Sequence, residues 1–198
     1  MPELVEFLSR PAVEVAPELL GAEITANGVT VRLTEVEAYA GPHDPGSHAF
    51  RRTPRSAIMY GAPGILYCYL VYGMHVCANV VTGGVDEAGA VLLRAGEVVA
   101  GEAEARVRRP GVEVHALARG PANLGRVLGL SLADNGLDLV TGPVRLTPPA
   151  ALVDLPASGP RVGLRRGADT PWRFWVDGNP SVSSYRPAAV RARPPRPS

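Results

Sequence analysis

Lysine is absent from this chain of 198 residues, and all 20 basic residues are arginine. The absence excludes a Schiff base formed by a lysine amine and a lysine general base. It also excludes the phosphate-binding loop that depends on a lysine.

Cysteine is scarce, since Cys68 and Cys77 are the only two. Two thiols are too few for a disulfide framework or for a zinc or iron–sulfur site with four thiolates. We expect both to be buried free thiols.

Long apolar runs are missing as well. No stretch approaches 18 uninterrupted apolar residues, which excludes a membrane span. The first six residues carry acids where a secretory signal carries bases, and no long apolar stretch follows them. We therefore expect a cytoplasmic protein without a membrane partner.

The composition that is present indicates a folded domain. Hydrophobic residues make up 46% of the chain and charged residues 20%, which suffices for a sizeable core and excludes bulk disorder. The length predicts one domain, which we place at 1–185. The stretch 186–198, rich in proline and arginine, is expected to be a disordered tail.

Charge is unevenly distributed, although the formal net charge is only +1. Residues 1–40 hold seven Glu against two Arg, whereas 151–198 hold eight Arg against three Asp. If the two ends lie apart in the fold, this gradient predicts an acidic side and a basic side. A basic face suits a polyanionic partner.

The chain contains 22 Gly and 20 Pro, residues that interrupt regular secondary structure. Their frequency favours short strands and loops over long helices. The Asn27-Gly28 dipeptide supplies the positive φ of a type I′ turn and predicts a hairpin between 23–26 and 29–39. A second hairpin is expected from 65–71 and 74–81, with its tip at Tyr72-Gly73-Met74. Further expected elements are helices at 11–20, 101–109 and 120–130 and strands at 88–96, 144–146, 161–164 and 173–176.

Two carboxylates, Glu35 and Glu37, lie two residues apart on the long strand of the first hairpin. Unless a bulge intervenes, both project from the face that Val29, Val31 and Leu33 make apolar, at the mouth of the core. The alternative is a strand that runs out into solvent, with the acids protecting an edge.

His43, Asp44 and His48 follow Glu37 within eleven residues. Together they could ligate a metal, but a loop of this kind more often uses Asp44 and Ser47 for turn and cap hydrogen bonds. We expect no metal. His48 could instead stack against a ligand or donate a hydrogen bond to it.

Four of the six tyrosines fall within thirteen residues around the second hairpin, at positions 60, 67, 69 and 72. Tyr67 and Tyr69 point to one face, while Tyr72 sits at the tip, where a large ring is difficult to bury. The pattern fits a tyrosine-rich core hairpin. With Met74 beside Tyr72 it also fits a wedge that enters a stack of bases.

Asn79 and Arg94 are polar residues inside otherwise apolar strands. A buried polar group needs a specific partner or lines a pocket. Arg94 would pair naturally with a buried carboxylate such as Glu37, an arrangement that could serve catalysis or structure alone.

These residues occur in motifs that closely resemble the alkyladenine (3-methyladenine, or methylpurine) DNA glycosylase family. The resemblance runs from about Pro11 to Ser183, with several separate motifs in the right order. They are Thr34–Tyr39 with Gly41-Pro42, Asp44 and His48; Gly64–Met74 with Cys77 and Asn79; Val91–Ala95; Gly120-Pro121 with Leu124; Gly159–Gly163; and Arg173-Phe174 with Gly178 and Pro180.

The resemblance implies a single mixed α+β domain around a curved, largely antiparallel sheet, whose second hairpin inserts into the DNA minor groove. By the same resemblance Glu37 is the general base that activates water, and Arg94 and the Val162 carbonyl hold that water. The implied base pocket contains Tyr39 and His48 on one side of the flipped base, Tyr69 on the other, and Asn79, which helps to exclude guanine. Tyr72, with Met74 beside it, fills the gap in the duplex, and Arg51, Arg52, Arg55 and Arg161 are expected to contact the DNA backbone.

We therefore expect a DNA repair enzyme that flips and hydrolytically excises alkylated or deaminated purines from double-stranded DNA. The lesions that fit an aromatic slot are 3-methyladenine, 7-methylguanine, hypoxanthine and ethenoadenine. Without a lysine amine the enzyme is expected to be monofunctional. We further expect a monomer that needs no cofactor and no obligate protein partner. In a bacterium it would be associated with the nucleoid. The alternatives are a non-catalytic module that binds distorted DNA and a metal-dependent hydrolase built on Glu37, His43, Asp44 and His48.

Overall fold

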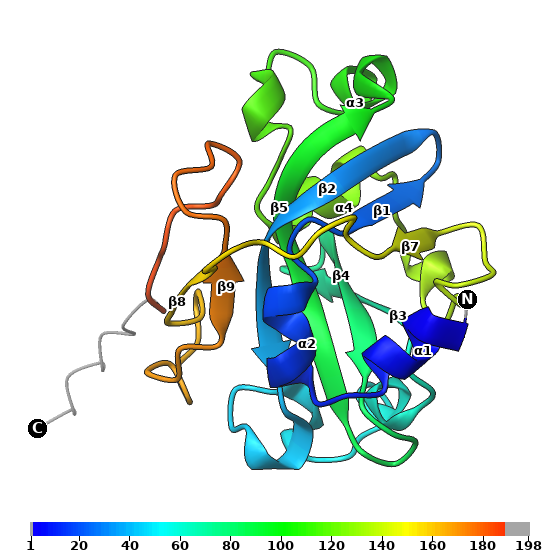
Figure 1. The fold of residues 1–198 in the computed structure, drawn as a ribbon, viewed down its shortest axis with the longest axis vertical. Helices are drawn as coiled ribbons and strands as arrows, with labels where there is room; N and C mark the ends of the chain where they lie inside the picture. Colours follow the sequence, from blue (N-terminus) through cyan, green and yellow to red (C-terminus); the bar gives the residue numbers. More distant parts are fainter. Residues whose placement is uncertain (1, 189–198) are drawn as a thin grey trace, which may run out of the picture.

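Two long antiparallel strands form the centre of the sheet, β2 (Val29–Tyr39) and β5 (Gly89–Ala100). The computed structural model describes residues 2–188 of the chain. Its nine-stranded sheet has the order β3-β4-β5-β2-β1-β7, while β6 pairs with β5, β9 pairs with β2, and β8 pairs with β9. The pairings are antiparallel and the sheet curls (Figure 1), so the expected α+β fold around a curved sheet is confirmed.

The remaining elements are short, as the frequent glycine and proline predict. The other strands are β1 (Glu23–Ala26), β3 (Leu66–Val71), β4 (His75–Thr82), β6 (Ala118–Arg119), β7 (Arg145–Thr147), β8 (Ala157–Gly159) and β9 (Arg173–Trp175). The α-helices are α1 (Pro2–Leu8), α2 (Ala12–Glu18), α3 (Glu102–Arg108) and α4 (Pro121–Val127). Single 3₁₀ turns are η1 (Gly41–His43), η2 (His48–Phe50), η3 (Ala57–Tyr60), η4 (Val114–Ala116) and η5 (Leu132–Asp134).

Both predicted hairpins are present. Asn27 and Gly28 have φ values of 48° and 79° and join β1 to β2. Tyr72 and Gly73, at 53° and 69°, make a similar turn between β3 and β4. Positive φ at both central residues is what a type I′ turn requires, and it matches the twist of the flanking strands.

Helices α2 and α4 cover the central strands. Helix α2 packs on β2 and β5, and α4 packs on β4 and β5. Their apolar residues join those of β1, β2 and β5 in one continuous core that includes Leu19, Leu33 and Leu124, all fully buried. Gly125 allows the close approach of α4, because a Cβ there would collide with the Val76 carbonyl.

A β-bulge in β2 changes which face its carboxylates occupy. The β2–β5 register shifts between Leu33 and Val36, so that both of these residues lie in the apolar core. The prediction that Glu35 and Glu37 share the face of the valines is therefore wrong, because the register shifts on either side of Glu35 break the alternation between Leu33 and Val36. Both carboxylates are also fully buried, which rules out the alternative of an exposed strand edge.

Other differences from the sequence predictions are local. Residues 161–164 form a turn rather than a strand, since the pairing segment β8 ends just before them. Strand β5 continues four residues beyond the expected end, and helix α1 was not predicted. Most of the predicted tail lies outside the described residues, although the Arg186 carbonyl accepts a hydrogen bond from Gly163 N. Within residues 2–188, no helix combines the length and apolar character needed to cross a membrane.

Candidate active site

A cavity of about 620 Å³ lies where β2, β3, β4 and β5 meet the turn at 162–164. Its wall combines one carboxylate with aromatic rings, including Glu37, Tyr39, His48, Tyr67, Tyr69 and Tyr72. Asn79 and Arg94 also line it. The cavity therefore gathers the catalytic and base-pocket residues that the resemblance implied from separate parts of the chain.

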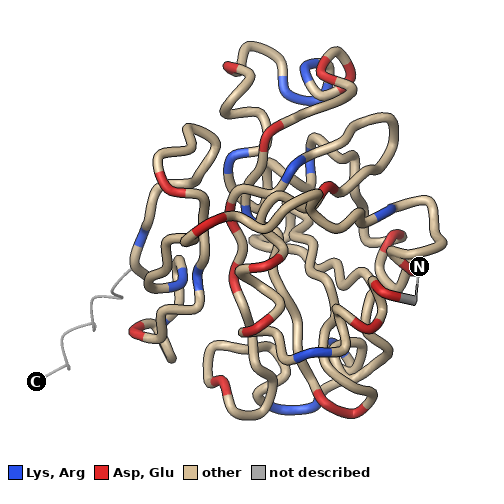
Figure 2. Tube along the Cα trace, in the orientation of Figure 1, with Lys and Arg blue, Asp and Glu red and all other residues tan. Residues whose placement is uncertain are grey.

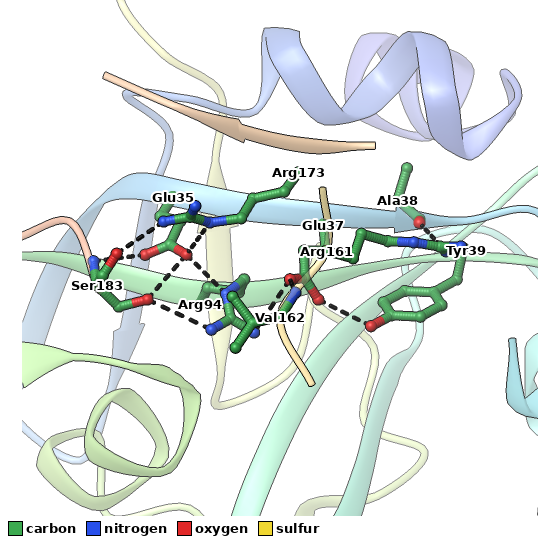
Figure 3. A network of polar contacts seen from close by, with 9 residues as sticks. All are labelled: Glu35, Glu37, Ala38, Tyr39, Arg94, Arg161, Val162, Arg173 and Ser183. Atoms are coloured by element: carbon green, nitrogen blue, oxygen red, sulfur yellow. Dashed lines mark hydrogen bonds and ion pairs between the residues drawn. The ribbon is translucent and has the colours of Figure 1, made fainter. Parts of the chain in front are cut away.

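Glu37 is the buried carboxylate of this cavity, and its position is held by two hydrogen-bond donors and one ion pair (Figure 3). The Tyr39 hydroxyl donates to Oε2 at 2.8 Å, and the Val162 backbone N–H donates to Oε1 at 2.7 Å. The Arg94 Nη1 lies 3.2 Å from Oε1. These contacts fix the direction of the carboxylate, and it is the N–H of Val162, rather than its carbonyl, that touches Glu37.

Glu35 anchors Arg94 from the other side. It accepts hydrogen bonds of 2.7 Å from the Nε atoms of both Arg94 and Arg173. The backbone N–H and hydroxyl of Ser183 donate to it at 2.7 and 2.9 Å. Burial would raise the pKa of Glu35, but the two guanidinium groups outweigh it and hold that pKa below the ordinary value.

Arg94 therefore bridges two carboxylates, where the sequence predicted a pairing with one. Its side chain is 7% exposed, and burial alone would lower its pKa. The charges of Glu37 and Glu35 reverse that effect and raise the Arg94 pKa. A fixed positive charge thus sits beside Glu37 in a buried setting, where electrostatic effects are stronger than in water.

The aromatic wall is held together by contacts between its own members. The His48 Nδ1 lies 3.0 Å from the Tyr67 hydroxyl oxygen, and its ring meets Tyr69 edge-on, with centroids 4.7 Å apart and planes at 77°. Rings whose centres lie 4.7 Å apart leave no room for a base between them, so a base stacked between His48 and Tyr69 requires these rings to move apart.

The groups of this wall are neutral near pH 7. Burial, and secondarily the charge of Arg55, lower the pKa of His48 to about 4. Burial raises the pKa values of Tyr67 and Tyr69. The rings therefore present π-faces and uncharged polar edges to the cavity.

Asn79 and Cys77 complete the floor. The Asn79 Nδ2 donates to the Tyr67 carbonyl at 3.1 Å, which fixes its amide. Burial raises the pKa of Cys77 to about 11 and that of Cys68 to about 12, so both thiols stay protonated. Both are buried free cysteines, as predicted.

The tip of the second hairpin projects into solvent. Tyr72 is 88% exposed and Met74 is 72% exposed, although both are large apolar side chains. Tyr72 also lines the cavity. An exposed ring on a tight turn beside a buried carboxylate has the shape expected of a wedge, and DNA insertion stays a prediction.

The arginines expected at the DNA backbone differ in their surroundings. Arg51, Arg52 and Arg55 are exposed; Arg52 pairs with Asp86 at 3.0 Å, and Arg55 lies over the Tyr69 ring at 5.1 Å. Arg161 corrects the prediction, because its side chain is 0% exposed and is paired with Asp44. It cannot reach a phosphate without leaving the core.

Burial of charged residues also weakens the predicted charge gradient; Figure 2 shows where these residues lie along the trace. Glu35 and Glu37, at the acidic end of the chain, are paired inside the fold with arginines. Arg161 and Arg173, from the basic end, are buried too. A count along the sequence overstates the charge that reaches the surface.

Asp44 has structural partners, which removes the central ligand of the metal alternative. Its oxygens accept from Arg161 and from the backbone N–H groups of Ala40 and Gly46. Ser47 caps η2 by accepting from Ala49 N, so the predicted turn and cap bonds are confirmed. Among residues 2–188, no group of three or more His, Cys, Asp and Glu side chains is placed to hold a metal ion.

The anchoring role of Glu35 and its partners Arg173 and Ser183 is not predicted by the sequence patterns. A signal existed for two of them, since Glu35 shares the motif of Glu37 and Arg173 lies in a later motif of the resemblance. Ser183 carried none. Its contacts with Glu35 span 148 positions of the chain and become visible only in the fold.

Comparison with known proteins places the whole arrangement in one family. Residues 6–180 match the family described as methylpurine-DNA glycosylase (MPG). Three bacterial relatives share the printed name "Putative 3-methyladenine DNA glycosylase". The one from Cutibacterium acnes is 49% identical over 188 residues, covering 90% of this chain and 98% of its own. Those from Nocardia farcinica and Leifsonia xyli are each 51% identical, over 210 and 189 residues, covering 97% and 88% of this chain and 98% and 88% of their own. The chain therefore belongs to the methylpurine-DNA glycosylase family.

Proposed function

We propose that this protein is a monofunctional DNA glycosylase that flips damaged purines out of double-stranded DNA and hydrolyses their N-glycosidic bonds. The substrates are alkylated or deaminated purines: 3-methyladenine, 7-methylguanine, hypoxanthine and ethenoadenine. Family membership supports the glycosylase class. The observation that carries the proposal is the fully buried Glu37, oriented by two hydrogen bonds and an ion pair within an aromatic cavity.

The cavity wall supports selection by charge and shape. Alkylation at N3 or N7 makes a purine cationic, and each good contact with an electron-rich ring favours a cation by about 0.5–2 kcal/mol. Tyr39 and Tyr69 supply such rings. The low pKa of His48 keeps its imidazole neutral, so that it does not repel the cation. Asn79 discriminates against normal guanine.

Access to the bond requires extrusion of the nucleotide. Its target carbon is hidden within the duplex, and flipping costs a few kcal/mol, least for a weakly paired lesion. Tyr72, 88% exposed at the hairpin tip, fills the vacated space with Met74 beside it. Arg51, Arg52 and Arg55 contact the phosphates around the lesion.

In the chemical step, the damaged base leaves the sugar and Glu37 activates the attacking water. The bond from C1′ to the base nitrogen breaks with its electron pair on the base, which leaves an oxocarbenium-like sugar. Glu37 takes a proton from water as the water oxygen bonds to C1′. Arg94 and the Val162 carbonyl hold that water. The products are the free base and an abasic site.

The reaction ends at the abasic site, since strand cleavage through a Schiff base needs an amine nucleophile. The chain has no lysine to supply a side-chain amine. Its 20 arginines stay protonated and do not substitute for it.

Release of free base from two duplexes, one methylated and one carrying a single hypoxanthine, tests the proposal with EDTA present. Release from both supports a broad, metal-independent glycosylase. Release from methylated DNA alone means that the pocket depends on a cationic leaving group. Tight binding without release from either would contradict the proposal and favour the non-catalytic module.

A further inference from the structure

Arg161 is fully buried beside the active cavity, with its guanidinium against the ring of Tyr39. Its guanidinium lies 4.7 Å from the centre of the Tyr39 ring and 5.2 Å from that of Trp172. Its side chain is fully buried, whereas Tyr39 lines the cavity. A cation thus backs the ring that faces the substrate site.

Polar contacts lock the guanidinium in place. Both of its terminal nitrogens donate to the Asp44 carboxylate, with Nη2 at 2.7 Å from Oδ1. Nη1 also donates to the Ala38 carbonyl at 2.9 Å, and Nη2 to the Gly167 carbonyl at 3.2 Å. The fork geometry is specific to arginine, because a lysine ammonium cannot reproduce the bidentate pair.

Close approach depends on small residues around the guanidinium. A Cβ on Gly46 would come within 2.9 Å of Arg161 Nη2, and one on Gly167 within 3.1 Å of the same atom. Arg161 therefore sits in a compartment shaped for it, distinct from the exposed arginines at 51, 52 and 55.

The position of Arg161 connects it to both hydrogen-bond donors of Glu37. Its side chain bonds the backbone at Ala38 and packs on Tyr39, whose hydroxyl donates to Oε2. Its own backbone leads directly into Val162, whose N–H donates to Oε1. One buried side chain thereby ties β2 to the turn at 161–164.

We propose that Arg161, held by Asp44, is a positioning residue that orients Glu37 through the Tyr39 hydroxyl and the Val162 amide. The proposal rests on the proposed function of Glu37 as general base. The Arg161 side chain is fully buried, so its role is not to bind DNA. Arg161 acts by holding the Glu37 carboxylate within the narrow range of positions that proton transfer from water requires.

Single-turnover excision by Arg161→Lys tests this role. The excision rate constant should fall on the order of 10- to 100-fold, because small misplacement of a catalytic group has effects of this size. Binding to the damaged duplex should change little, since Arg161 is buried. Arg109→Lys is a matched control: Arg109 is half-buried and donates to the Ala116 and Leu117 carbonyls in another part of the fold, so excision should stay at the wild-type rate.

A double-mutant cycle separates positioning from general loss of structure. In a Tyr39→Phe background the hydroxyl that donates to Glu37 is already missing. The further fall in excision rate caused by Arg161→Lys should therefore be smaller than in the wild type. An equal fold-loss in both backgrounds would overturn the proposed coupling. If Arg161→Lys fails to fold, Asp44→Asn, which removes the bidentate ion pair while keeping the shape, provides the same comparison.

The Val162 amide gives a readout that does not depend on activity. Its 2.7 Å hydrogen bond to a carboxylate predicts a downfield amide proton resonance. Arg161→Lys and Glu37→Gln should both move this resonance upfield, and Arg109→Lys should leave it in place. An unmoved Val162 resonance in Arg161→Lys would refute the positioning role, whether or not the protein releases base. Failure of the wild-type protein to release base would refute the proposed function alone.

Discussion

Replacement of Glu35 by glutamine should destabilise the fold through the loss of one buried negative charge. Glu35 is fully buried and accepts four hydrogen bonds, two of them from the guanidinium groups of Arg94 and Arg173. Glu35→Gln keeps the shape but leaves Arg173 without a carboxylate and Arg94 with Glu37 alone. Breaking a buried ion pair from one side costs about 3–5 kcal/mol, and we expect the free energy of unfolding to fall by that amount.

The pH dependence of stability follows from the same site. The pKa of Glu35 is lower in the folded state, so its contribution is present above the unfolded pKa of about 4.3 and is lost as the pH falls through the folded value. Wild-type protein should therefore lose stability as the pH is lowered below about 4.3. Glu35→Gln should remove the part of this pH dependence of the unfolding free energy that comes from the ionisation of Glu35.

Urea unfolding at pH 7 and at several values below pH 5 measures both effects. Glu23→Gln is the control, because Glu23 forms an ion pair with Arg32 at the surface and is 35% exposed. Such pairs contribute about 0–1 kcal/mol. Two results would contradict the structural role of Glu35. One is a loss of unfolding free energy in Glu35→Gln no larger than in Glu23→Gln. The other is an unchanged dependence of stability on pH below pH 5.

Two further predictions concern the cavity and the hairpin. The Hε1 resonance of His48 should titrate with a midpoint of about 4, and Arg55→Gln should raise that midpoint because the repelling charge is gone; a wild-type midpoint near 6.5 would contradict the burial of this ring. Tyr72→Ala should change the free energy of unfolding by no more than about 0.5 kcal/mol, because the ring is 88% exposed. The same variant should bind a damaged duplex more weakly in a fluorescence anisotropy titration, and unchanged affinity would argue against a wedge.

Local sequence was enough to predict the hairpins that frame the cavity. Asn27-Gly28 is a dipeptide that favours positive φ at both positions, and the tip at Tyr72-Gly73 is marked by its glycine and by the apolar runs on either side of it. The same holds for the exposed ring at Tyr72, since a hairpin tip offers little that could cover it.

Contacts between distant segments could not be predicted in this way. The pairing of Arg161 with Asp44 spans 117 positions, and the contact of Arg173 with Glu35 spans 138. An arginine on a short polar segment is indistinguishable in sequence from one that contacts phosphate. Arg161 was therefore assigned to the surface, whereas its charge is neutralised within the core.

The bulge in β2 shows a similar limit. Period-two alternation placed Glu35 and Glu37 on the apolar face, but the register shifts between Leu33 and Val36 broke it. No single residue in that stretch marks the bulge. Its position is set by pairing with β5, more than fifty residues later, and it turns the carboxylates toward their arginine partners.

The most direct test of Glu37 as general base is single-turnover base release by Glu37→Gln from a duplex that carries one ethenoadenine. The amide keeps the shape of the side chain but cannot take the proton from water. Excision should fall by at least about 100-fold, while affinity for the same duplex is retained. Near-normal release by Glu37→Gln would contradict the account and remove Glu37 from the catalytic role.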